Sequence, residues 1–117
     1  EGEIRLMDQS RGRLTYLYVT DAAAMLLSIL LSGNEPVYNV GGISSATIFD
    51  LAHIIAREIK VPMSAPQEDA DLAGPPTDFA LDLSRYTSEF GKTKFVPMDE
   101  GLRRTIAWQR RLYGSTR

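Results

Sequence analysis

Apolar and polar positions alternate along the chain in blocks that predict short strands joined to helices. Residues 14–19 are rich in β-branched and aromatic side chains and predict a strand. Residues 22–31 are apolar apart from Ser28, which predicts a helix that is apolar nearly all round and therefore buried. Apolar residues recur at helical spacing over 48–59 and again, among arginines, over 98–113. The apolar stripe of the first of these consists of Ile48, Leu51, Ala52, Ile55 and Ile59.

The remaining segments predict shorter elements. Residues 37–42 predict a second strand, which follows Pro36 and is broken by its own two glycines. Residues 84–90 predict a short helix that Gly91 ends. The weaker predictions are a strand at 4–7, a turn at 8–12, an edge strand or extended link at 61–66, a mobile acidic loop at 67–78 and an extended piece at 79–82.

Three helix ends carry polar signals. Asp21 is expected to cap the first long helix, because its carboxylate can accept hydrogen bonds from first-turn amides and suits the positive helix end. Thr47, with Asp50 three residues later, approximates a capping box. The pair Gly33-Asn34 is expected to end the first long helix, since both residues tolerate left-handed backbone angles.

The composition is that of one globular domain, residues 1–117, with no sign of a nucleic-acid or membrane partner. The formal net charge is −2, and the ten-residue apolar run 22–31 is about half of what a membrane span needs. Cysteine is absent, which excludes disulfides and thiolate metal sites and is compatible with the expected cytoplasmic location. The start Glu1-Gly-Glu is acidic where a signal peptide is basic, and without Met it suggests a trimmed chain.

Five features follow one another along the sequence. They are the strand leading to Asp21, the segment Tyr38–Gly42, the helix 48–59, the segment Leu81–Arg85 before Phe90-Gly91, and the closing helix with Glu100, Gly101, Leu102, Thr105, Ile106 and Trp108. In this order they resemble the C-terminal, substrate-binding half of NAD-dependent sugar-nucleotide epimerases and dehydratases, the extended short-chain dehydrogenases. The resemblance implies a small α/β lobe of short strands and three to four helices, without the Rossmann half.

The family's catalytic parts are absent from this sequence. It has no glycine-rich loop of the G-x-G-x-x-G or G-x-x-G-x-x-G type. Its five tyrosines are followed four residues later by Thr20, Ala22, Gly42, Phe90 and Arg117, never by the lysine of the family's tyrosine-lysine pair. We therefore expect that this chain alone neither binds NAD(P) nor catalyses, and that both functions belong to the missing N-terminal Rossmann half of a parent oxidoreductase or isomerase.

The resemblance also implies candidate substrate-binding residues. The family's diphosphate-binding arginine lies seven residues before the acid, a position that Leu14 occupies here. Arg13 is the nearest arginine and our first candidate, with Arg11 second. The one-residue offset places Arg13 on the opposite face of a regular strand, and a bulge at Gly12 would return it to the face of the family's arginine. The alternative is two solvated arginines near a turn. Since the family's second arginine is missing from 67–78, a less charged substrate is also open.

Other residues have both a functional and a structural reading. Tyr16 and Tyr18 share one strand face and either pack on a sugar or, the favoured reading, fill the core. His53 is the only histidine and lacks metal-ligating partners in sequence. A surface or partly buried histidine is therefore favoured, and no metal site is expected. The loop acids Glu68, Asp69, Asp71 and Asp78 either bind a hard cation or, the favoured reading, are solvated. The five arginines after Glu100 either form a phosphate or nucleic-acid patch or, again favoured, a solvated helix face.

Three functions remain open at this level. The first is a fragment that binds a nucleotide sugar for hydride transfer in an intact NAD(P)-dependent epimerase, dehydratase or reductase. The second is a stand-alone, non-catalytic α/β binding or oligomerisation module. The third, more distant, is a stand-alone acid–base enzyme that uses His53 and carboxylates. Because the apolar helix 22–31 and the Tyr16/Tyr18 strand exceed what 117 residues easily cover, we also expect self-association.

Overall fold

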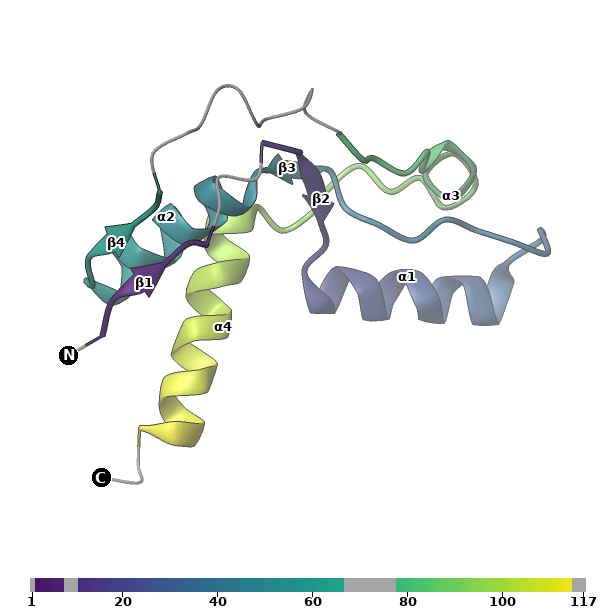
Figure 1. The fold of residues 1–117 in the computed structure, drawn as a ribbon. Coiled ribbons are helices and arrows are strands. Elements are labelled where there is room, and N and C mark those ends of the chain that lie inside the picture. The colour runs from purple at the N-terminus through teal and green to yellow at the C-terminus, as the bar shows by residue number, and fades with distance from the viewer. Residues whose placement is uncertain (1, 8–10, 67–77, 115–117) are drawn as a thin grey trace.

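The computed structural model describes residues 2–7, 11–66 and 78–114, and in that part of the chain it contains four short strands and four helices (Figure 1). This mixed α/β content confirms the expected fold class, whereas the expected turn at 8–12 and loop at 67–78 fall largely outside the described residues. The elements are β1 (Ile4–Arg5), β2 (Leu14–Tyr16), α1 (Val19–Ser32), β3 (Ser44–Ala46), α2 (Ile48–Ile59), β4 (Met63–Ser64), α3 (Ser84–Phe90) and α4 (Met98–Tyr113).

The strands form two separate pairs. β1 and β4 are parallel, with Ile4 opposite Met63, and β2 and β3 are antiparallel, with Thr15 opposite Ser45. Helix α2 follows β3 directly and contacts β3, β4 and α4. Helix α2 therefore connects the β2–β3 pair, through β3, with α4, and its Ala52 is buried.

Helix α2 confirms its sequence prediction at both ends. The Thr47 hydroxyl accepts from the Asp50 amide at 3.1 Å, and the Asp50 carboxylate accepts from the Thr47 amide at 3.0 Å. The capping box is therefore complete. Helices α3 and α4 also have the expected bounds, and Gly91 ends α3 with a left-handed φ of 64°.

Helix α1 begins three residues earlier than expected, and Asp21 is not its N-cap. Tyr18 occupies the N-cap position without a side-chain cap. Asp21 lies in the first turn, where its carboxylate accepts from the Val96 amide at 2.8 Å and from Lys92 Nζ at 2.9 Å. The capping prediction was wrong because a tertiary partner offers this carboxylate better donors than its own helix does.

The expected left-handed end of α1 was also wrong. Gly33 has an extended conformation, with φ of −66° and ψ of 133°. A Cβ at Gly33 would lie 2.6 Å from the Ile29 carbonyl oxygen, so the glycine is needed for close approach to the helix end.

The segment 37–42 is not a strand, because no other backbone segment in the described chain pairs with it as a ladder. Its side chains pack instead. The Tyr38 ring meets Tyr86 edge-on at 6.5 Å, and Tyr86 stacks on Phe90 at 4.7 Å. The Tyr38 hydroxyl donates to Glu89 and accepts from the Asn34 amide, which fastens α3 to the end of α1.

The prediction that α1 is buried was wrong for this chain. Only Asp21 and Met25 of its residues are buried, and Leu30 and Leu31 are 79% and 80% exposed. Nor is the molecule as a whole compact. Its Cα radius of gyration is 17.5 Å, with extents of 48 × 45 × 19 Å, whereas a compact domain of this length has a radius of about 13 Å.

Candidate functional site

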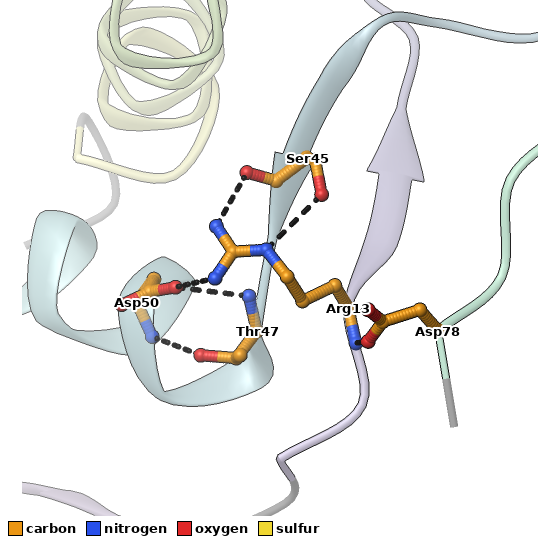
Figure 2. Close-up of polar contacts among 5 residues, drawn as sticks. All are labelled: Arg13, Ser45, Thr47, Asp50 and Asp78. Carbon is orange, nitrogen blue, oxygen red and sulfur yellow. Dashed lines mark hydrogen bonds and ion pairs between the residues drawn. The ribbon is translucent and has the colours of Figure 1, made fainter. Parts of the chain in front are cut away.

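Arg13 lies just before β2 and reaches across to β3 and α2. Its Nε donates to Ser45 Oγ at 3.3 Å, and its Nη2 donates to the Ser45 carbonyl oxygen at 3.3 Å (Figure 2). Its Nη1 lies 3.9 Å from Asp50 Oδ2, and the side chain stays 49% exposed. A guanidinium has five N–H donors, so Arg13 keeps donors for a solvent-side anion while these contacts hold it in place.

The carboxylate that faces Arg13 belongs to the α2 capping box. Hydrogen bonding from Thr47, its backbone amide first, and then the charge of Arg13 hold the pKa of Asp50 below its ordinary value. Asp50 therefore stays ionised in weak acid and has two tasks. It caps α2, and it orients the guanidinium of Arg13.

The backbone of Arg13 is fixed by the segment that follows the acidic loop. The Arg13 amide donates to Asp78 Oδ1 at 2.9 Å, and the Phe79 amide donates to the Arg13 carbonyl at 2.9 Å. The expected loop acids other than Asp78 lie outside the described residues. Arg11, the second candidate, is exposed two residues before Arg13.

Tyr16 faces the interior between β2 and α4. Its hydroxyl is buried and has no hydrogen-bond partner in the described part of the chain. It lines a cavity of about 150 Å³ together with Ser44, Met98, Leu102 and Thr105. This position favours the core-packing reading of Tyr16, and a contact with substrate stays a prediction.

The Tyr18 ring accounts for the glycine of the closing-helix motif, Gly101. A Cβ at Gly101 would lie 2.9 Å from Cδ2 of the Tyr18 ring, so only glycine lets α4 pack this closely. The Arg104 guanidinium lies over the same ring, 5.8 Å from its centroid. Next to this contact is a groove of about 690 Å³, lined by Tyr18, Val19, Arg104, Thr105, Ala107, Trp108 and Arg111.

Two motifs that lie far apart in the sequence form a polar pocket that sequence reasoning missed. Asn39 Nδ2 donates to the Asp82 carbonyl at 3.0 Å, and Arg85 Nη1 donates to the Val37 carbonyl at 2.8 Å. The pocket has a volume of about 220 Å³, and Ser84 completes its lining. Both segments can be recognised in the sequence, but nothing in the sequence indicates that they are in contact.

The other candidate residues are at the surface. His53 is exposed on α2. Arg103 pairs with Asp99 at 3.1 Å, and Arg104 pairs with Glu100, both one helical turn apart on α4. Within the ranges described, no group of three His, Cys, Asp or Glu residues is placed to hold a metal ion. In the same ranges, no helix combines the length and apolar character of a membrane span.

The fold of this chain matches part of the fold of the extended short-chain dehydrogenases, which confirms the resemblance found in the sequence. No family model matches the chain. In sequence it is 28% identical over 109 residues to a dTDP-glucose 4,6-dehydratase of Actinoplanes sp., a match that covers 92% of this chain and 34% of the relative.

Solved structures agree with this assignment of fold. The dTDP-glucose 4,6-dehydratase of Bacillus anthracis, in complex with NAD, superposes with a TM-score of 0.73 at 18% identity, over 96% of this chain and 35% of that one. RMD of Pseudomonas aeruginosa, complexed with NADPH, gives 0.74 at 19% identity, over 95% and 36%. UDP-glucuronic acid 4-epimerase of Bacillus cereus, in complex with NAD, gives 0.70 at 16% identity, over 98% and 34%. This chain thus spans about a third of each relative, consistent with a C-terminal part.

Proposed function

We propose that this chain is the substrate-binding part of an NAD(P)-dependent dehydratase, epimerase or reductase that acts on a nucleotide sugar. The observation that carries the proposal is the sequence match to a dTDP-glucose 4,6-dehydratase over 92% of this chain. The open, flat shape supports it, because a lobe that shares its core with a larger body has little interior of its own.

The cofactor belongs to the rest of such a parent, because the residues of this chain do not fit NAD(P). Neither the glycine-rich loop that holds a pyrophosphate nor the tyrosine-lysine pair occurs in the sequence. The chain's own contribution is to hold the sugar nucleotide. Arg13 is the first candidate for the diphosphate, with its guanidinium oriented by Ser45 and Asp50.

A titration of the chain with dTDP-glucose, followed by nuclear magnetic resonance, tests the proposal. We expect chemical-shift changes at Arg13 and Ser45, and weaker ones with glucose alone. Arg13→Ala should lower the affinity about tenfold or more, because a charged hydrogen bond contributes about 1.5 to 3 kcal/mol. Arg110→Ala, which alters an exposed arginine of α4, is the matched control and should change nothing. An absence of shift changes at millimolar nucleotide sugar would refute the proposal.

A further inference from the structure

A small polar pocket lies between the segment 37–39 and the start of α3. It is lined by Val37, Asn39, Asp82, Ser84 and Arg85, and its volume is about 220 Å³. At about 30 Å³ each, roughly seven water molecules would fill this volume. Pockets for drug-sized ligands begin at about 300 Å³. The pocket therefore suits an occupant about as large as one sugar ring, and a nucleotide sugar is too large for it.

Contacts between its own walls hold the pocket in shape. Asn39 Nδ2 donates to the Asp82 carbonyl at 3.0 Å, and Arg85 Nη1 donates to the Val37 carbonyl at 2.8 Å. The Ser84 amide donates to Asp82 Oδ1 at 2.9 Å, which fixes the carboxylate as well. Polar groups that are positioned before a ligand arrives lose less conformational entropy when it binds.

The lining side chains offer hydrogen-bond donors and acceptors together. The Val37 carbonyl uses one of the five N–H groups of Arg85, and the Asp82 carbonyl uses one of the two N–H groups of Asn39. Asn39 Oδ1 and the Asp82 carboxylate are acceptors, and the Ser84 hydroxyl can both donate and accept. A sugar hydroxyl also both donates and accepts, so adjacent hydroxyls of one ring can use this mixed set.

The two charged groups of the pocket cancel each other. The Ser84 side chain and amide, and then the charge of Arg85, hold the pKa of Asp82 below its ordinary value, so this carboxylate is ionised at neutral pH. A phosphate would bring further negative charge beside it. An amino acid would meet both charges, but Asp82 and Arg85 are exposed, and exposed ion pairs contribute little. A neutral ligand with many hydroxyls is therefore favoured over both.

We propose that this pocket binds a single neutral sugar ring through hydrogen bonds from its hydroxyls to Asn39, Asp82 and Arg85. This inference goes beyond the proposed function and does not depend on it. In Figure 1 α3 lies apart from β3 and α2, the elements that hold the partners of Arg13. Because all the lining residues are exposed, we expect dissociation constants in the millimolar range.

Titration of the whole chain with glucose, galactose and mannose, followed by nuclear magnetic resonance, tests the proposal. We expect at least one of these sugars to shift the side-chain amide of Asn39 and the backbone amides of Ser84 and Arg85 in a saturable way. Inorganic phosphate and glycine at equal concentration should shift them less. No saturable shift with any of the three sugars, or a larger shift with phosphate or glycine, would overturn the proposal. Shifts at Ser45 report on the proposed function, so either proposal can fail alone.

Two serines of α3 supply a matched pair of variants. Ser84→Ala removes a lining hydroxyl but keeps the amide that donates to Asp82, and it should raise the sugar dissociation constant about threefold or more. Ser88→Ala removes the same atom from an exposed serine outside the pocket and should leave the constant unchanged. Arg85→Lys keeps the charge but not the planar fork and should raise the constant about tenfold. Equal effects of the two serine variants would contradict the proposal.

Discussion

Asp21 links α1 to the segment that leads into α4 through its buried carboxylate. It accepts from Lys92 Nζ and from the Val96 amide, and the side chains of both Asp21 and Lys92 are largely shielded from water. Burial alone would raise the pKa of Asp21, but the Val96 amide and the Lys92 ammonium outweigh it and hold the pKa below its ordinary value. The folded state thus favours the ionised carboxylate.

Asp21→Asn should lower the free energy of unfolding by about 1.5 to 3 kcal/mol at pH 7, since it removes a charged hydrogen bond from a shielded site. A folded-state pKa below the unfolded value means that this stabilisation is present above about pH 4 and is lost as the pH falls through the folded-state pKa. Urea unfolding of both proteins at pH 7 and pH 3 measures the effect. The gap should narrow at pH 3, and an equal gap at both values would contradict the role of the charge. Lys94→Met, at an exposed lysine, is the control.

At the scale of elements, the helices divide according to where their stabilising contacts lie. α2 has its cap, its apolar stripe and its C-terminal turn within residues 47–60, where Lys60 takes the left-handed position. Only the packing of its stripe comes from other elements, β3, β4 and α4. α1 has no side-chain cap, and its large exposed side chains are apolar. Its position therefore depends on Asp21 and on any partner that packs against this apolar side.

Thr47→Ala should therefore destabilise the chain by about 1 kcal/mol, because it leaves a first-turn amide of α2 without its acceptor. Thermal unfolding followed by circular dichroism measures the loss. Thr93→Ala removes the same atoms from an exposed threonine outside any helix and should change the stability by less than about 0.5 kcal/mol. If both substitutions have the same small effect, the capping box does not stabilise α2 in solution.

At the scale of the whole molecule, the chain is an open plate of 48 × 45 × 19 Å. The buried apolar side chains in the described ranges are few and mostly small, and Met25 and Tyr86 are the only large ones among them. A structure of this kind supplies surface to a larger assembly more readily than it encloses a ligand of its own. This is consistent with a chain that spans about a third of its relatives.

The isolated chain should accordingly not bind NAD or NADP in the low micromolar range. The physical reason is that nothing in the sequence provides the run of glycine amides at a helix start that holds a pyrophosphate. Isothermal titration calorimetry with each dinucleotide measures this, and the dTDP-glucose titration of the same preparation serves as the control for competent protein. Low-micromolar dissociation of either dinucleotide would contradict the proposed function.

The sequence by itself determined what depends on neighbouring residues. The capping box of Thr47 and Asp50, the end of α3 at Gly91 and the bounds of α2 and α4 all rest on contacts within one helical turn or on a single helical stripe. The order of its motifs was also enough to give the fold class, although one of the five, Tyr38–Gly42, forms no regular element in this chain.

Only the tertiary structure decided what depends on distant partners. Asp21 binds the Val96 amide instead of capping α1, and Asn39 meets Asp82 across 43 residues. The segment 37–42 stays unpaired because no strand in the described part of the chain lies beside it. The exposure of α1 belongs to this group. The hydropathy of α1 indicates that this apolar helix favours burial. Whether other elements of the chain cover the helix depends on how much surface those elements supply.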